Sequence, residues 1–148
     1  ISWFDWRLLE THADIHHFVK RLIRFRQGLS IHREDRGLSL VQLLHQSGLR
    51  WHGVRLDWPD WSHQSHSVAF SVQGRRGSFH LIMNAYSEPL EFELPPVPTN
   101  APDGWRRVID TYLESPEDIC PWDEAPVIEG ATYLAQPRSV VLLLAAGT

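Results

Sequence analysis

The chain has 148 residues, and its 43% hydrophobic and 22% charged residues are typical of one folded globular domain, which argues against a disordered protein. Fourteen basic against eighteen acidic residues give a formal charge of -4, which disfavours a nucleic-acid-binding surface, and no apolar run is long enough to span a bilayer. The single cysteine, Cys120, cannot form an internal disulfide, and no signal peptide is recognisable, so we expect a cytoplasmic protein with neither nucleic acid nor membrane as a partner.

Residues 11–28 carry apolar side chains at the spacing of an amphipathic helix, with Ile15, Phe18 and Leu22 on one face. Thr11 stands three residues before Asp14, a spacing that favours a capping box at the start of this helix. A lone helix in front of an all-β remainder is typical of the last helix of a preceding domain. We therefore predict that residues 1–30 end one domain and that residues 31–148 form a β domain. The chain also begins without Met, which we interpret as a sign that it was cut out of a longer protein.

Residues 31–37 are polar and predict a connector, with a short helical turn at 38–45. Residues 49–56 alternate loosely enough for a strand. The following residues, 57–62, contain Pro59 and two acids that favour turns, so they predict a loop that carries Trp58 and Trp61.

The stretch 77–94 alternates apolar and polar residues with a period of two and predicts a β-hairpin whose turn is 86–89. Within it we expect Phe79, Leu81 and Met83 to face the core and His80 and Asn84 to point away. Residues 68–72 repeat the pattern, so we expect the three strands to form a meander.

Further strands are expected at 105–112, 127–134 and 139–145. The last is apolar on both sides, as a central strand would be. Seven or so short strands with irregular loops predict an antiparallel Greek-key β-sandwich behind one amphipathic helix.

The sequence offers little catalytic machinery. His12 and His16 share a helix face and His63 and His66 share a loop, but neither pair has the further ligand that a zinc site needs. The acids read as turn or exposed-strand residues, whereas glycoside hydrolysis needs one carboxylic acid in an apolar pocket. We therefore predict no catalytic residue, no metal and no cofactor.

The unusual feature of the composition is its tryptophan content, with seven tryptophans in 148 residues. Trp51, Trp58 and Trp61 form a stacking platform for sugar rings if they are exposed and co-planar, or fasten a loop to the sheet if they are buried. The sequence alone leaves both alternatives open.

Several segments resemble the bacterial and plastid glycogen debranching enzymes of isoamylase type, within the α-amylase superfamily. They are Ile-Ser-Trp-Phe-Asp-Trp at 1–6, the helix at 18–26, Trp-His-Gly-Val at 51–54, Pro-Asp-Trp-Ser at 59–62, Ser-His-Ser-Val-Ala-Phe at 65–70 and Leu-Ile-Met-Asn-Ala-Tyr at 81–86.

The resemblance implies that residues 1–30 are the loop and last helix of a catalytic β/α barrel and that the sandwich is the C-terminal domain of an enzyme that hydrolyses α-1,6-glucosidic branch points of glycogen. The family's three catalytic carboxylates would lie upstream of Ile1. Trp3 and Asp5 match a segment near the family's glucan cleft, so the candidate substrate-binding residues are Trp3, Asp5, Trp58 and Trp61. The expected partners are the barrel and α-glucan; the alternative function is a glucan-binding module that uses surface tryptophans.

Overall fold

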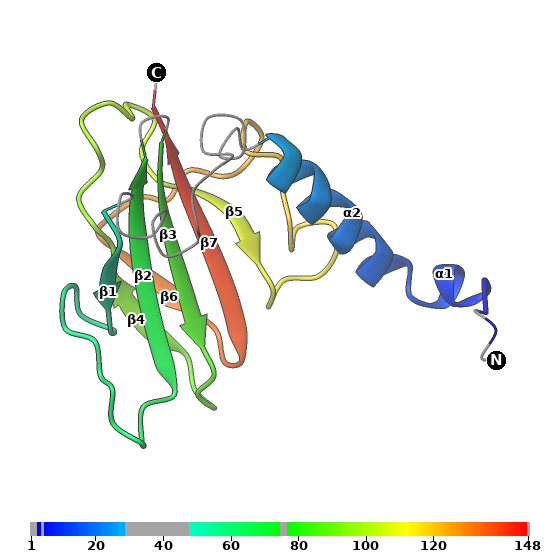
Figure 1. The fold of residues 1–148 in the computed structure, drawn as a ribbon, viewed down its shortest axis with the longest axis horizontal. Helices are drawn as coiled ribbons and strands as arrows, with labels where there is room; N and C mark the ends of the chain where they lie inside the picture. The colour runs from blue at the N-terminus through cyan, green and yellow to red at the C-terminus, as the bar shows by residue number, and fades with distance from the viewer. Residues whose placement is uncertain (1–2, 4, 29–47, 75–76, 148) are drawn as a thin grey trace, which may run out of the picture.

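The computed structural model describes residues 3, 5–28, 48–74 and 77–147 (Figure 1). The predicted connector at 31–37 and the turn at 38–45 lie outside these residues. Within them no helix has the length and apolar character needed to cross a membrane.

Within the described ranges two helices precede seven strands, which confirms the prediction of a mainly β chain behind an N-terminal helix. The elements are α1 (Leu8–Thr11), α2 (Ala13–Gly28), β1 (Arg50–His52), β2 (Ser67–Gly74), β3 (Gly77–Asn84), β4 (Leu90–Glu93), β5 (Arg106–Asp110), β6 (Thr132–Ala135) and β7 (Ser139–Ala146). One antiparallel sheet has the order β1-β2-β3-β7-β5, and a second pairs β4 with β6.

The helix at the N-terminus differs from the prediction only at its start. Thr11 ends the short α1 and its hydroxyl donates to the Arg7 carbonyl at 3.4 Å, so it does not form the expected capping box with Asp14. Helix α2 begins at Ala13 because His12 leaves the helical conformation, with φ -120° and ψ 44°.

The hairpin between β2 and β3 is present, but the predicted hairpin between β3 and β4 is wrong. Strand β3 pairs with β7 along all eight residues, and β4 pairs with β6 in the other sheet. Strand β7 is apolar on both sides and can fill a central position, whereas Glu91 and Glu93 leave β4 with one face that must stay in water. The turn after β3 therefore carries the chain from one sheet to the other.

The predicted faces of β3 are also reversed. His80, Ile82 and Asn84 are buried between the sheets, while Phe79 and its alternating neighbours Leu81 and Met83 are half-buried on the opposite side. Asn84 is kept inside by its hydrogen bonds, since its Nδ2 donates to the carbonyls of Glu88, Ala135 and Gln136 at 3.0–3.1 Å.

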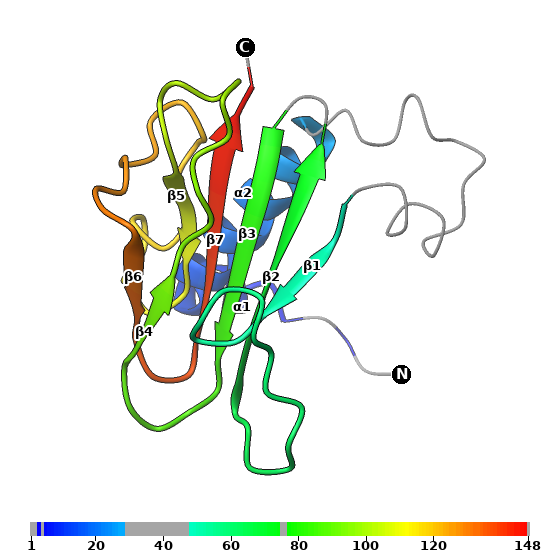
Figure 2. The ribbon, with the colours of Figure 1, turned by 90° about the vertical axis from the view of Figure 1, so that its left-hand side faces the viewer.

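A core fills the space between the two sheets and is built from side chains of both. Its buried residues are Ala69, Ile82, Phe92, Leu94, Ala101, Trp105, Ala135, Val141, Leu143 and Ala145. Figure 2 shows β4 and β6 side by side on one side of the molecule, with α2 behind β3 and β7.

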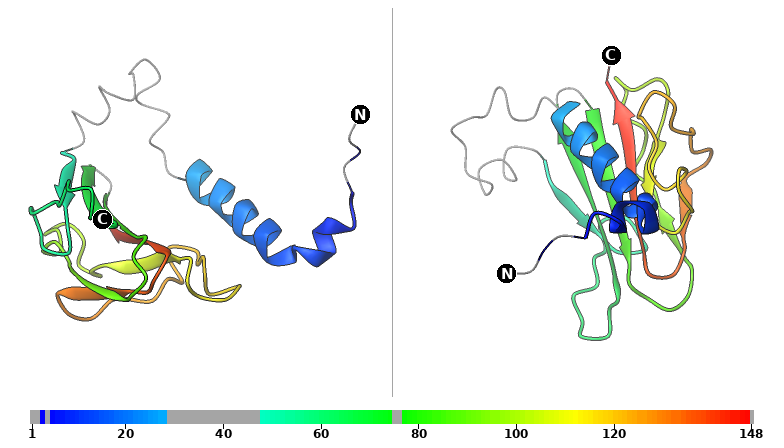
Figure 3. Two further views of the ribbon diagram at one scale, coloured as in Figure 1. Left: turned by 90° about the horizontal axis from the view of Figure 1, so that it is seen from below. Right: turned by 90° about the vertical axis from the view of Figure 1, so that its right-hand side faces the viewer.

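The other side of the larger sheet, called here the outer face, is apolar as well. It presents alternate residues of four strands, namely Trp51, Val68, Phe70, Val72, Phe79, Leu81, Met83, Val140, Leu142 and Leu144. Helix α2 covers one end of it, because Phe18 and Phe25 pack against a cluster that contains Leu142 and Leu144. Figure 3 shows α2 in front of this face and α1 projecting away from the sheets.

Candidate functional site

The loop between β1 and β2, residues 53–66, is called here the tryptophan loop. Its indoles at Trp58 and Trp61 are 75% and 67% exposed, and Trp51 on the adjoining strand is 41% exposed. Trp51 and Trp61 meet edge to face, with ring centroids 5.5 Å apart and planes at 72°, and Trp51 also contacts Phe70 at 5.3 Å. The rings are thus exposed but not co-planar, which matches neither of the two simple alternatives.

Hydrogen bonds fix the backbone of the tryptophan loop although its indoles stay in solvent. The Leu56 N–H donates to the Glu93 carboxylate and the Glu93 N–H donates to the Val54 carbonyl, both at 2.9 Å, so the loop lies along the edge of β4. Gly53 approaches so closely that a Cβ there would stand 2.4 Å from the Trp58 carbonyl oxygen. The sequence places a glycine where no other residue fits.

Trp3 and Asp5 lie far from this loop. They belong to the segment before α1, at the opposite end of the molecule from β1 (Figure 1). Trp3 is 90% exposed, and the Asp5 carboxylate pairs with Arg7 at 2.7 Å, which lowers the pKa of Asp5 below its usual value. The structure does not bring the four candidate substrate-binding residues together.

The histidine pairs singled out by spacing are surface residues. His12, His16, His63 and His66 are exposed, and His66 contacts the Gln64 carbonyl through Nδ1 at 2.6 Å. Among the residues with described positions, no three His, Cys, Asp or Glu side chains are grouped so that they could hold a metal ion.

Two other histidines, which the sequence did not single out, are buried together between the sheets. His52 is 2% exposed and His80 is fully buried, with ring centroids 5.6 Å apart. Burial, reinforced by the charge of His52, lowers the pKa of His80 to about 4, and burial also lowers the pKa of His52. Within the described part of the chain, neither nitrogen of His80 has a hydrogen-bond partner. The sequence does contain a signal for this pair, because each histidine lies inside a stretch that alternates apolar and polar residues, where one face of the strand is buried.

His52 lies between a serine and an aspartate, as in a nucleophilic triad, but its proton is on the wrong nitrogen. The Ser71 hydroxyl is 2.8 Å from Nε2, and Asp57 lies on the Nδ1 side. However, Nδ1 accepts the backbone N–H of Asp57 at 2.8 Å, so the neutral ring carries its proton on Nε2 and donates to Ser71. A general base must accept the nucleophile's proton there, so this geometry does not activate Ser71.

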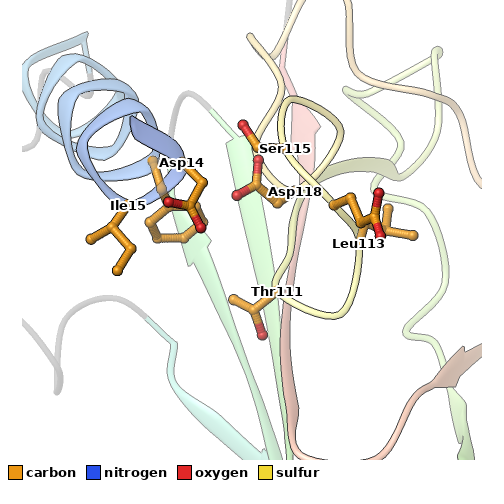
Figure 4. A pocket seen from close by; sticks show the side chains of 8 residues that line it. Asp14, Ile15, Thr111, Leu113, Ser115 and Asp118 are labelled. Carbon is orange, nitrogen blue, oxygen red and sulfur yellow. The ribbon is translucent and has the colours of Figure 1, made fainter. Parts of the chain in front are cut away.

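An open groove of about 520 Å³ lies between α2 and the segment after β5 (Figure 4). Figure 4 shows Asp14 of α2 and Asp118 facing each other across it. Glu114 adds a third carboxylate, and the other lining residues are Ile15, Phe18, Thr111, Leu113 and Ser115. A glycosidase acid needs an apolar pocket that excludes water, and this groove is open to solvent.

Comparison with known proteins identifies the family to which the β domain is similar. The profile of the family described as "Isoamylase 1-3, C-terminal" matches residues 50–142, from the start of β1 into β7. The chain is 34% identical over 149 residues to "Isoamylase 3, chloroplastic" of Oryza sativa subsp. japonica, which covers 98% of this chain and 17% of that relative. It is 28% identical over 121 residues to "Isoamylase SU1, chloroplastic" of Zea mays and 30% identical over 120 residues to "Isoamylase 1, chloroplastic" of Arabidopsis thaliana, in both cases with 80% of this chain and 14% of the relative. The chain therefore spans less than a fifth of the length of these relatives.

Proposed function

This chain belongs to the family of isoamylase C-terminal domains, and from that membership we propose that it is the non-catalytic C-terminal part of a glycogen debranching enzyme. In this proposal the rest of the enzyme is a β/α barrel that hydrolyses α-1,6-glucosidic branch linkages. Residues 1–30 end that barrel, and residues 31–148 form a domain that packs on it and stabilises it. A cytoplasmic location and a bacterial source remain predictions, because the three relatives are named as chloroplastic.

The observation that carries the proposal is the amount of apolar side-chain surface that stays exposed among the described residues. On α2, Ile15, Val19, Leu22 and Ile23 are 39–58% exposed. Ile15 and Leu22 alternate along the helix with Phe18 and Phe25, which touch the sheet, so the exposed residues continue a face that is already packed. Contiguous apolar surface of this kind marks a protein interface, and the longer relatives have the additional chain to cover it.

Substitution of Ile23 in the full-length protein tests this packing. Ile23→Asp should change the stability of the isolated chain by no more than about 0.5 kcal/mol, because the residue is exposed there. In the full-length enzyme the same change should lower stability by about 2 kcal/mol or more, since it buries a charge against the barrel. Both values come from urea unfolding, with loss of debranching activity on heating as a second readout.

Arg24→Asp, at the next and also exposed position, is the matched control and should have a small effect in both proteins. Equal behaviour of the two variants in the full-length enzyme would refute packing of α2 against the barrel. The isolated chain should also release no reducing ends from a branched limit dextrin, and release above the buffer level would contradict its non-catalytic role.

A second candidate function is weak contact with α-glucan through Trp58 and Trp61. Their exposure of 75% and 67% favours it, because a buried indole could not stack on a sugar ring. Since the rings form no flat platform, we expect a dissociation constant of about 1 mM for maltoheptaose, which corresponds to about -4 kcal/mol. Titration followed by amide shifts, with Trp58→Ala against Trp122→Ala, an exposed indole elsewhere, tests this site. Trp3 and Asp5 keep their proposed place near the glucan cleft of the full-length enzyme, which activity of a Trp3→Ala variant would test.

A further inference from the structure

His52 is held by hydrogen bonds on both sides of its ring, at the point where β1 enters the tryptophan loop. Its Nε2 donates to the Ser71 hydroxyl of β2, and its Nδ1 accepts the Asp57 N–H, each at 2.8 Å. The second bond exists only while Nδ1 has a free lone pair. It therefore requires the neutral imidazole.

Asp57 offers the same nitrogen a second partner of the opposite kind. One oxygen of its carboxylate is 3.4 Å from Nδ1, and the other oxygen pairs with Arg50 of β1. A protonated Nδ1 would repel the backbone N–H and donate to the carboxylate instead. One residue thus supplies a donor for the neutral ring and an acceptor for the charged ring.

We propose that His52 and Asp57 form a proton-operated switch that exchanges the backbone hydrogen bond of Asp57 for its carboxylate and thereby reorients Trp58. When Nδ1 takes a proton from solvent, the Asp57 N–H loses its acceptor. Asp57 has φ 58°, a left-handed conformation that costs a non-glycine residue energy and persists only where surrounding contacts hold it. The loss of that contact frees the Leu56–Asp57 peptide, so the backbone of Asp57 can leave this conformation. The next peptide, which leads into Trp58, is then held by the Trp58 N–H, which donates to the Arg55 carbonyl at 3.4 Å, a long and therefore weak hydrogen bond.

The change stays local because the neighbouring residue has its own anchor. Leu56 remains bonded to Glu93 of β4, so the backbone moves after it and not before it. The Trp58 carbonyl rests against Gly53, and Trp58 itself is exposed, so its indole can turn without opening the core. The switch needs no glucan and does not depend on either proposed function.

The groups that face His52 define the pH range in which the switch works. Burial lowers the pKa of His52 from its usual value, Asp57 opposes this shift and Arg50 adds to it. His80 of β3 has a pKa of about 4, so it is mostly neutral over the pH range in which His52 is expected to take up its proton. Burial favours the neutral ring in the folded chain, so the hydrogen bond from the Asp57 N–H to Nδ1 persists at neutral pH. This bond is lost as the pH falls below 6.5 and the ring takes up a proton.

Nuclear magnetic resonance of the whole 148-residue chain, titrated from pH 7.5 to pH 4.5, tests the switch. We expect one transition in which the His52 ring nitrogens, the Asp57 amide and the Trp58 indole resonance shift with the same midpoint. Hydrogen exchange at the Asp57 amide, corrected for its intrinsic pH dependence, should rise about tenfold or more across it, while circular dichroism shows the fold unchanged. Trp58→Phe assigns the indole signal.

The variant Asp57→Asn keeps the backbone N–H and tolerates the left-handed conformation but removes the charged acceptor. Its transition should move about one pH unit lower, which is a tenfold weaker proton affinity of His52. Asp60→Asn, which changes a second carboxylate of the same loop, should leave the midpoint in place. The proposal is overturned if His52 titrates while the Asp57 amide and Trp58 do not, if Asp57→Asn has the wild-type midpoint, or if the transition coincides with global unfolding.

Discussion

Replacement of His80 by leucine should stabilise the chain, and the gain should grow as the pH falls. His80 is fully buried between the sheets, opposite Ser71 on β2 and Leu143 on β7, and neither of its ring nitrogens has a hydrogen-bond partner among the residues that the structure describes. A buried donor or acceptor without a partner costs about 1–3 kcal/mol. Leucine has a similar volume and no polar atom, so we expect a gain of about 1 kcal/mol at pH 7.5 after a small cost of repacking.

The pH dependence follows from the pKa of about 4 for His80 in the folded chain, against 6.5 for an unperturbed histidine. As pH falls below 6.5 the unfolded chain binds a proton that the folded chain does not bind, so the wild type loses stability until about pH 4. At pH 5 this loss amounts to about 2 kcal/mol, and it reaches about 3 kcal/mol once both states are protonated. The leucine variant lacks this loss.

Urea unfolding at pH 7.5, 6 and 5 measures both effects, with circular dichroism as the signal. The difference between variant and wild type should increase by about 2 kcal/mol between pH 7.5 and pH 5. His63→Leu, at an exposed position, is the control and should show no such increase. Parallel pH profiles for His80→Leu and wild type would show that His80 either is protonated in the folded chain or finds a partner there.

Three further substitutions test contacts that hold the sheets and the tryptophan loop together. Asn84→Ala should lower the free energy of unfolding by about 2–4 kcal/mol, because it leaves buried carbonyls without their donor. Tyr133→Phe should cost about 1–2 kcal/mol, since the Tyr133 hydroxyl donates to the buried carboxylate of Asp110 at 2.7 Å. Gly53→Ala should cost about 1–3 kcal/mol and shift the Trp58 fluorescence, because its Cβ would clash with the Trp58 carbonyl. Urea unfolding measures all three, and a change below 0.5 kcal/mol at Asn84 would contradict its role as a link between the sheets.

The elements that local patterns could predict are those whose signal lies within one stretch of sequence. The helical spacing predicted 11–28 and the structure has α2 at Ala13–Gly28, while the apolar run at 139–145 correctly predicted a central strand. The exposure of Trp58 and Trp61 also agrees with the loop that Pro59 predicts. In each case neighbouring residues along the chain decide the outcome.

The pairing of strands could not be predicted in the same way. Strand β4 finds its partner β6 more than forty residues later, with Leu90 opposite Ala135, and nothing in either strand alone identifies the other. A turn sequence at 86–89 fits a hairpin as well as a crossing between sheets. The hydrogen bonds of Asn84 to the carbonyls of Ala135 and Gln136 stabilise the crossing between the sheets over a hairpin, and they form only in the folded chain.

The same limit applies to the buried histidines. His80 alternates with apolar residues and so was expected to face water, and His52 sits in a strand of only three residues. The burial of His52 is supported by Ser71, which supplies its hydrogen-bond partner from a different strand. A contact between strands leaves no trace in the local pattern of either one.

The reversed faces of β3 have a physical reason that bears on the proposed function. In a two-sheet sandwich the outer face is normally polar, so an apolar alternation such as Phe79, Leu81 and Met83 is assigned to the core. Here the inner face carries His80 and Asn84, while the outer face is apolar in β1, β2, β3 and β7. The fifth strand, β5, adds Arg106 opposite Leu144. A sheet with a buried inner face and a largely apolar outer face is typical of a middle layer, and among the described elements α2 covers one end of that outer face. The wrong prediction for β3 thus supports the same proposal as the exposed residues of α2, namely that this surface is an interface and that the additional chain of a longer protein, such as the relatives have, covers it.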